Sequence, residues 1–380
     1  MSIRNNNLGS INKPGFNALG AQTNVTTYTY ELWSWGQGSQ GKLGLGNTTS
    51  YSSPKQVGAL TTWSTVAATG GGCQFAAAIK TDGTLWSWGR NFEGQLGLGD
   101  ILNRSSPAQV GALTAWLKVA VGYSFTVARK TDGTLWSWGI NNVGSLGLGN
   151  VTYYSSPKQV GALTTWLNIA GGGYHTLATK TDGTLWAWGK NNYGQLGLGN
   201  ITNYSSPKQV GALTTWLKVA CVYHTLAIKT DGTLWAWGSN GSGELGLGNI
   251  VYKSSPNQVG ALSTWSNIAC GPYYSLAIKT DGTLWSWGRG AQAQLGLGNI
   301  TYYSSPKQIG ALTNWSTVSA GAYHGMAINT NGALYAWGSN SYGQIGDGTT
   351  TVRSSPVQVG ALTTWLITVG GYSNTIALKY

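Results

Sequence analysis

Short runs that alternate apolar and polar residues recur along the chain, and most of them flank an Asp-Gly or Asn-Gly pair. In residues 178–189, Ala-Thr-Lys-Thr-Asp-Gly-Thr-Leu-Trp-Ala-Trp-Gly, two such runs lie on either side of Asp182-Gly183. Asp-Gly readily supplies the two positive φ angles of a type I′ turn, so this segment is predicted to be an antiparallel β-hairpin. Because side chains alternate along a strand, the two tryptophans share one face.

The hairpin returns about every 50 residues, with turns at 82–83, 132–133, 182–183, 231–232, 281–282 and 331–332. The Trp-Gly pair that ends the second strand of the hairpin, here called the Trp-Gly exit, occurs seven times, against six turns. The seven are at Trp35, Trp88, Trp138, Trp188, Trp237, Trp287 and Trp337. Residues 375–380 resemble a first hairpin strand that lacks a turn, and residues 31–36 a second strand that lacks a predecessor. If the two ends pair, a ring closes and no terminal sheet edge remains. The sequence therefore predicts an all-β, seven-bladed β-propeller closed by its own N- and C-terminal strands.

Each repeat contains four strand-like stretches, which is the number in an antiparallel propeller blade. They are the Trp-x-Trp-Gly run, a Ser-Ser-Pro-x-Gln-Val run, a segment like 217–220 and a segment like 224–229. Proline at the start of the Ser-Ser-Pro run suits an edge strand. A further tryptophan in each repeat is predicted to fill the interface between blades: Trp63, Trp116, Trp166, Trp216, Trp265, Trp315 and Trp365.

The run Leu-Trp-x-Trp-Gly-x-Asn-x-x-Gly-Gln-Leu-Gly-Leu-Gly, followed by a Ser-Pro strand and Gly-x-x-His-Thr-Leu-Ala, resembles the repeat of the regulator of chromosome condensation family. The resemblance covers all seven repeats, from residue 28 to residue 380. It implies a seven-bladed propeller that serves mainly as a docking platform, and it leaves the partner open.

The repeats form a single domain at 28–380, because a repeat period overrides the domain count that length alone suggests. Residues 1–27 are rich in Asn, Gly and Thr and fit no repeat, so we expect an extended N-terminal arm. No run of eighteen apolar residues and no signal-peptide pattern occurs, so no membrane span is expected. The three cysteines, Cys73, Cys221 and Cys270, fall in one region of three different repeats and are expected to be buried free thiols.

The net charge is +12, which raises the question of nucleic-acid binding. Six lysines lie beside the hairpin turns, where five aspartates follow them, so that side of the ring is nearly neutral. The positive excess lies on other loops and supports only a weak expectation of salt-sensitive DNA binding.

The candidates for chemistry have structural explanations. The three histidines, His175, His224 and His324, share one repeat position with Phe75, Phe125, Tyr274 and Asn374, which indicates packing. Each hairpin aspartate is explained by its turn, and no acidic cluster suits a metal. No nucleotide-binding or hydrolase motif appears. We expect no enzyme activity, no catalytic residue, no metal and no cofactor.

The repeats differ most in the tip before Ser-Ser-Pro, so function is expected there, and Tyr and Arg are residues that anchor protein interfaces. The predicted partner contacts are Tyr51, Arg104, Tyr153, Tyr154, Tyr204, Tyr252, Lys253, Tyr302, Tyr303 and Arg353.

The main hypothesis is a non-catalytic interaction and structural propeller that grips a protein partner or a larger assembly through these tips and the N-terminal arm. The near-identical blades, the scarcity of charge and the Asn-rich arm suggest a component of a virion or another surface assembly, and a cytoplasmic location stays open. One alternative is guanine-nucleotide exchange on a small GTPase, but the Trp-Gly intervals leave no insertion large enough for a protruding wedge. The longest interval has its additional residues near 70–72. Another alternative is multivalent glycan binding by aromatic tips such as Tyr154 and Tyr204.

Overall fold

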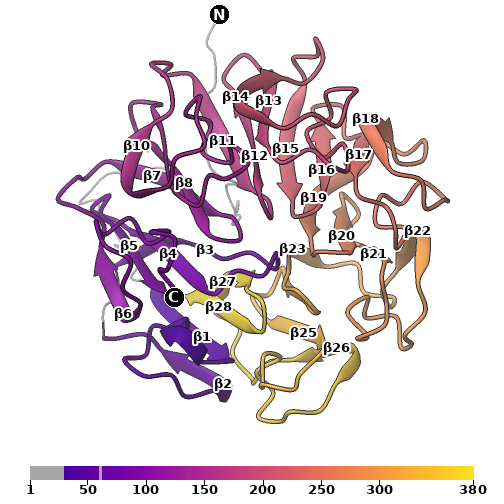
Figure 1. The fold of residues 1–380 in the computed structure, drawn as a ribbon. Helices are drawn as coiled ribbons and strands as arrows, with labels where there is room; N and C mark the ends of the chain where they lie inside the picture. Colours follow the sequence, from indigo (N-terminus) through magenta and orange to yellow (C-terminus); the bar gives the residue numbers. More distant parts are fainter. Residues whose placement is uncertain (1–29, 60–61) are drawn as a thin grey trace, which may run out of the picture.

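The computed structural model describes residues 30–59 and 62–380, which form seven four-stranded antiparallel sheets arranged in a ring (Figure 1). The predicted all-β, seven-bladed propeller is confirmed. The N-terminal arm predicted at 1–27 lies outside the described residues. One short 3-10 turn, η1 (Ser39–Gly41), accompanies the strands in the part that the structure describes.

The first strand of each blade contacts the first strands of both neighbouring blades, so these seven strands lie innermost. They are β3 (Trp63–Ala67), β7 (Trp116–Val121), β11 (Trp166–Gly171), β15 (Trp216–Cys221), β19 (Trp265–Cys270), β23 (Trp315–Ala320) and β27 (Trp365–Gly370). The second strands are β4 (Phe75–Lys80), β8 (Phe125–Lys130), β12 (His175–Lys180), β16 (His224–Lys229), β20 (Tyr274–Lys279), β24 (His324–Asn329) and β28 (Asn374–Lys379).

The third strands carry the Trp-Gly exits, and the fourth strands carry Ser-Ser-Pro at the outer edge, as proline predicts. The third strands are β1 (Glu31–Gly36), β5 (Leu85–Gly89), β9 (Leu135–Gly139), β13 (Leu185–Gly189), β17 (Leu234–Gly238), β21 (Leu284–Gly288) and β25 (Leu334–Gly338). The outer strands are β2 (Tyr51–Gln56), β6 (Arg104–Gln109), β10 (Tyr154–Gln159), β14 (Tyr204–Gln209), β18 (Lys253–Gln258), β22 (Tyr303–Gln308) and β26 (Arg353–Gln358).

The two ends of the chain share one blade. Its strand order is β2-β1-β28-β27, and β28 runs antiparallel to β1 from the pair Glu31 and Lys379 to the pair Gly36 and Asn374. The side chains of the first pair also form an ion pair, with Lys379 Nζ 3.2 Å from Glu31 Oε2. The predicted closure of the ring by its terminal strands is confirmed.

Tryptophans fill the boundaries between blades. Trp138 of β9 is fully buried against residues of the preceding blade, and its indole N–H donates to the Gln95 carbonyl of that blade at 2.9 Å. Trp116 packs beside it, with ring centroids 6.1 Å apart. Five further Trp-Gly tryptophans make the same bond to the adjacent blade: Trp35, Trp88, Trp237, Trp287 and Trp337. The prediction that tryptophans occupy these interfaces is confirmed.

The hairpin turns differ from the predicted type I′. Gly183 has φ +79°, whereas Asp182 keeps a negative φ. Lys180 N donates to Thr184 O at 3.0 Å, so the loop has three residues with glycine in the left-handed conformation. Only glycine takes that conformation without steric cost. The Asp182 carboxylate instead accepts hydrogen bonds from the Thr184 amide and hydroxyl, at 2.9 and 2.6 Å.

The lysines beside the hairpins lie over tryptophan rings. Lys180 Nζ is 3.6 Å from the ring centroid of Trp186, and burial lowers the pKa of this lysine. Equivalent contacts, at 3.6 to 4.5 Å, are made by Lys80, Lys130, Lys229, Lys279 and Lys379. These cations therefore serve packing on this side of the ring.

Removal of residues 374–380 should unfold or aggregate the protein, because it deletes β28 and leaves β1 and β27 with unpaired edges. The control is Lys379→Ala, which removes the ion pair with Glu31 and the contact with the Trp33 ring but keeps the backbone pairing of β28, and should cost only about 1–2 kcal/mol. Thermal unfolding followed by circular dichroism tests both variants. A truncated protein that melts like the wild type would show that closure contributes little.

Candidate functional site: the tyrosine face

The ring has two faces with different chemistry. The hairpins and the loops from outer to inner strands lie together, since Trp216 N donates to Gly183 O. That face exposes one leucine in each of six blades: Leu113, Leu163, Leu213, Leu262, Leu312 and Leu362. The opposite face carries the loops from inner to second strands and the long loops from third to outer strands. We call it the tyrosine face.

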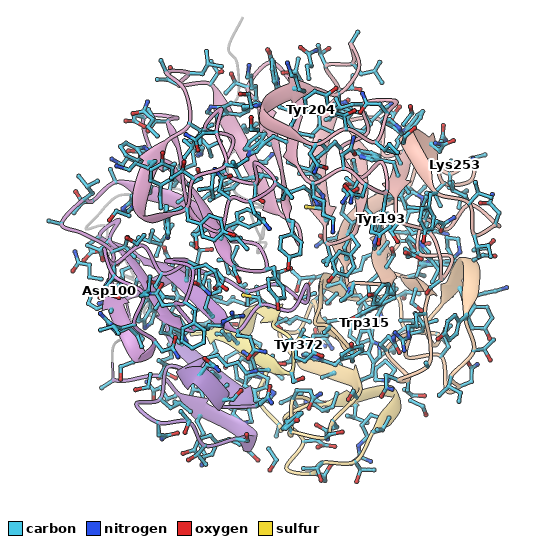
Figure 2. All side chains as sticks on the ribbon, in the orientation of Figure 1. Asp100, Tyr193, Tyr204, Lys253, Trp315 and Tyr372 are labelled. Carbon is cyan, nitrogen blue, oxygen red and sulfur yellow. The ribbon has the colours of Figure 1, made fainter. Side chains whose placement is uncertain are left out.

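Six tyrosines surround the central opening on this face. Each lies in the loop before a second strand and is half-buried: Tyr123, Tyr174, Tyr223, Tyr273, Tyr323 and Tyr372. They pack in neighbouring pairs, with ring centroids 5.3 Å apart for Tyr123 and Tyr174 and 5.5 Å apart for Tyr223 and Tyr273. Figure 2 labels Tyr372 near the centre of the ring. Burial, with smaller effects from neighbouring tyrosines, raises the pKa of Tyr223 to about 12, so this hydroxyl stays protonated.

The seventh loop, between β3 and β4, lies across the opening. A Cβ on Gly70 would be 2.5 Å from the carbonyl carbon of Gly321, and one on Gly71 would be 2.9 Å from Val222 Cγ1. Gly321 belongs to the blade β23–β26 and Val222 to the blade β15–β18, and neither of these adjoins the blade of β3 and β4. Figure 1 shows the segment after β3 running into the middle of the ring. The additional residues near 70–72 therefore reach across the opening, and a side chain at Gly70 would clash with the backbone of Gly321.

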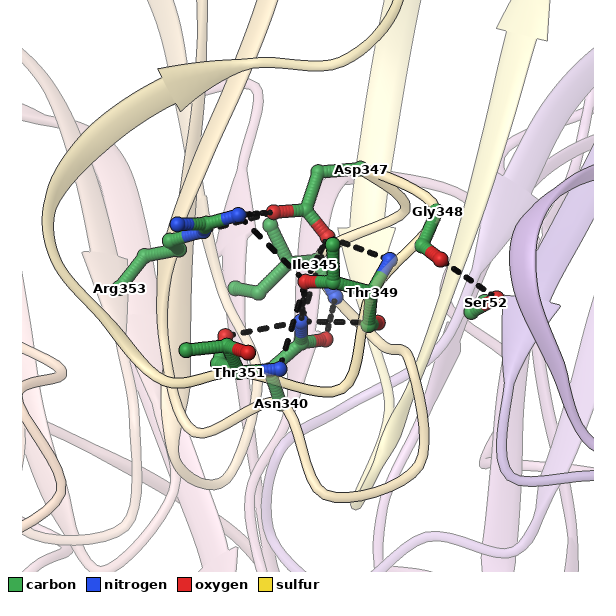
Figure 3. A network of polar contacts seen from close by, with 8 residues as sticks. All are labelled: Ser52, Asn340, Ile345, Asp347, Gly348, Thr349, Thr351 and Arg353. Atoms are coloured by element: carbon green, nitrogen blue, oxygen red, sulfur yellow. Dashed lines mark hydrogen bonds and ion pairs between the residues drawn. The ribbon is translucent and has the colours of Figure 1, made fainter.

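An asparagine fixes the conformation of each of five long loops. In the loop between β25 and β26, Asn340 Nδ2 donates to the carbonyls of Thr349 and Thr351, both at 3.0 Å, while its Oδ1 accepts from Ile345 N (Figure 3). Ser52 of the adjacent blade donates to Gly348 O at 3.3 Å. Asparagines at the same position in other loops are Asn91, Asn141, Asn191 and Asn240. These loops therefore display their variable side chains from a fixed backbone.

The predicted tip contacts fall into three groups. The first tyrosine of a tip is about half exposed, as for Tyr153, Tyr252 and Tyr302 at 46, 48 and 49%. The second tyrosine of a tip is half-buried in four loops: Tyr51, Tyr154, Tyr204 and Tyr303. In each case a lysine lies over its ring. Its hydroxyl accepts a hydrogen bond from an asparagine of the same loop.

The basic tips form the third group. Arg104 pairs with Asp100 and Arg353 with Asp347, at 2.5 and 2.6 Å. Lys253 is half-buried at the start of β18. Binding by the tips remains a prediction, and the exposed first tyrosines are best placed for it.

Two tyrosines of the long loops, Tyr193 and Tyr252, lie beside the central ring of six tyrosines. Tyr252 meets Tyr193 edge to face at 5.4 Å, and both line a pocket of about 430 Å³ with Tyr174, Tyr223 and Tyr273. The polar lining includes Lys190, Gln195, Ser239, Ser242 and Glu244. This pocket spans three neighbouring blades, so the sequence pattern within one repeat could not reveal it.

The histidines are packed in the interior, as predicted. Burial lowers the pKa of His175, His224 and His324 to about 3, so all three are neutral at pH 7. His224 and His324 each contact a hydroxyl of the next blade, at 2.7 and 3.0 Å. The cysteines are free and buried, and desolvation raises the pKa of Cys73 to about 12.

Among the described residues, no three His, Cys, Asp or Glu side chains converge on a metal position, and no helix is long and apolar enough to cross a bilayer.

Comparison with known proteins decides the family. The model of the RCC1-like domain matches residues 17–318, and models of the regulator of chromosome condensation (RCC1) repeat match residues 315–344 and 331–378. The chain belongs to the RCC1-like family. The resemblance found in the repeats is thereby confirmed.

Solved structures of other proteins share this fold over nearly the whole chain. Human WBSCR16 superposes with a TM-score of 0.82 at 21% identity, covering 92% of this chain and 98% of its own. Prp20p of Saccharomyces cerevisiae has a TM-score of 0.83 at 21% identity, covering 93% of this chain and 92% of its own. Identities this low establish the fold alone.

Curated relatives match over shorter segments. The human E3 ubiquitin-protein ligase HERC2 is 38% identical over 79 residues, which is 21% of this chain and 2% of HERC2. The mouse X-linked retinitis pigmentosa GTPase regulator is 35% identical over 97 residues, 25% of this chain and 10% of the relative. The ultraviolet-B receptor UVR8 of Arabidopsis thaliana is 35% identical over 84 residues, which is 22% of this chain and 19% of UVR8. The matched segments thus span a small part of each of these relatives.

The buried histidines predict a loss of stability in acid. Their pKa is about 3 in the folded state against 6.5 in the unfolded chain, so protons bind preferentially to the unfolded chain between these values. Stability therefore falls as pH drops below about 6.5, by up to about 1.4 kcal/mol per pH unit for each histidine. His175→Phe, which installs the residue found at Phe75 and Phe125, should lose less stability than the wild type between pH 7.5 and 5.5. Urea unfolding at both pH values measures this, and an equal loss in the two proteins would contradict it.

Proposed function

We propose that this RCC1-like propeller is a non-catalytic docking platform that binds a protein partner on its tyrosine face. The observation that carries the proposal is the arrangement of six half-buried tyrosines around an opening into which the 70–72 loop extends. Large aromatic side chains that are already ordered lose little entropy on binding and are frequent energetic centres of interfaces. The exposed first tyrosines of the tips extend this surface outward.

The electrostatics of the described residues support docking over catalysis. The histidines are neutral and enclosed, and burial raises the pKa of all three cysteine thiols, which disfavours thiolate chemistry. The relatives give a virion assignment no support, so the proposal is limited to protein docking. Glycan or nucleic-acid binding finds no support among them either.

A second candidate is nucleotide exchange on a small GTPase. The structure of Prp20p was reported together with its binding to Gsp1p and histones, and another relative is named a GTPase regulator. These are properties of those proteins. In this chain the longest repeat interval is used by the 70–72 loop, which lies within the opening and does not project from it. Docking alone therefore has better geometric support, and release of labelled GDP from Gsp1p or related GTPases measures the exchange activity.

The docking proposal predicts that substitutions on the two faces differ in effect. A double variant Tyr123→Ala and Tyr323→Ala should weaken capture of a protein partner at least tenfold, because central aromatic contacts each contribute on the order of 2 kcal/mol. Leu163→Ala with Leu213→Ala on the opposite face is the matched control and should capture the partner normally. Quantitative mass spectrometry of material bound by each folded variant is the measurement. Equal loss from both faces, or no protein enriched by the wild type, would contradict the proposal.

A further inference from the structure

The pocket on the tyrosine face combines aromatic walls with a buried carboxylate. Three of its tyrosines come from the central ring, and Tyr193 and Tyr252 come from two long loops. The faces of aromatic rings carry negative charge density, so a cluster of them attracts cations. Its volume of about 430 Å³ lies in the range of small-ligand sites.

Glu244 is the residue that distinguishes this pocket from the rest of the ring. Its side chain is 0% exposed, and four other blades have glutamine at its position: Gln95, Gln195, Gln294 and Gln344. Both residue types make the same structural bond. Gln195 Oε1 accepts from Tyr193 N at 2.9 Å, and Glu244 Oε2 accepts from Ser242 N at 2.7 Å. A neutral glutamine is thus sufficient for the loop, and the fold does not require the charge of Glu244.

The negative charge of Glu244 is not balanced by a basic side chain. Its second oxygen accepts from the neutral Ser239 hydroxyl at 2.7 Å. None of the ion pairs among the described residues includes Glu244. Lys190, at the pocket wall, lies over the ring of Tyr174, 5.4 Å from its centroid. A buried carboxylate without a basic partner is costly, and a ligand cation would reduce that cost.

We propose that this pocket binds an organic cation, a guanidinium or alkylammonium group, between its tyrosines and close to the buried charge of Glu244. The inference rests on the proposed function, because a docked protein is expected to supply the cation on an arginine or lysine side chain. A guanidinium is planar and stacks on aromatic rings, and its positive charge compensates a nearby carboxylate, whereas a neutral sugar would leave that charge uncompensated.

The direct test measures binding of small probes to the intact protein by calorimetry or NMR titration. The probes are Nα-acetyl-arginine amide and Nα-acetyl-trimethyllysine amide, with Nα-acetyl-citrulline amide as the uncharged match for arginine. We expect at least one cation to bind at least about tenfold more tightly than citrulline, since bonds to charged groups are the stronger ones. Glu244→Gln, which copies the residue of four other blades and should fold normally, should remove this preference.

The tyrosine contribution has matched controls within the chain. Tyr193→Ala and Tyr252→Ala should each weaken cation binding roughly three- to tenfold. Tyr342→Ala and Tyr302→Ala change the same two repeat positions in other blades, with similar exposure of 45% and 49%, and should leave it unchanged. The melting temperature of each variant shows that the fold is intact.

Three results would overturn the inference: neither cation binds, citrulline or maltose binds as tightly as the cations, or Glu244→Gln retains full affinity and preference. The two proposals can fail separately. Probe binding without any captured protein would leave the pocket standing and remove the docking function. Capture that Glu244→Gln leaves unchanged would retain docking and remove the cation from it.

Discussion

The pairing of β28 with β1 is the constraint on which the rest of this molecule depends. Each blade has two apolar faces, and tryptophans and aliphatic residues on them are covered only by the adjacent blades. An open array would leave two such faces and two strand edges in water. Six backbone-paired positions between residues 31–36 and 374–379 prevent this, and they do so with residues separated by almost the full length of the chain.

Repeated packing has a second effect, which is to separate stability from recognition. The tryptophan bonds between blades and the asparagine bonds within the long loops recur with nearly constant geometry. Side chains that differ between blades therefore project from equivalent backbone positions. A single change at such a position, such as glutamate in place of glutamine at residue 244, alters local charge while the loop keeps its hydrogen bonds.

Much of the fold could be predicted from the sequence because its determinants are local and repeated seven times. The sequence has six hairpin turns but seven Trp-Gly exits, and this difference was enough to predict that the terminal strands close the ring. The turn type was wrong, since Asp-Gly also fits a three-residue loop in which the aspartate binds the following threonine. The tyrosine ring was missed although Tyr174, Tyr223 and Tyr323 each precede a histidine in the sequence. Its significance lies in contacts between blades, as does that of the glycine loop, and no pattern within one repeat encodes them.

The glycine loop also changes the mechanics of the ring. By reaching from β3 to the loops before β16 and β24, it joins blades that are not neighbours in the ring. A distortion that flattens the circle must shift these close backbone contacts. The loop therefore acts as a cross-brace, which packing between neighbouring blades alone would not provide.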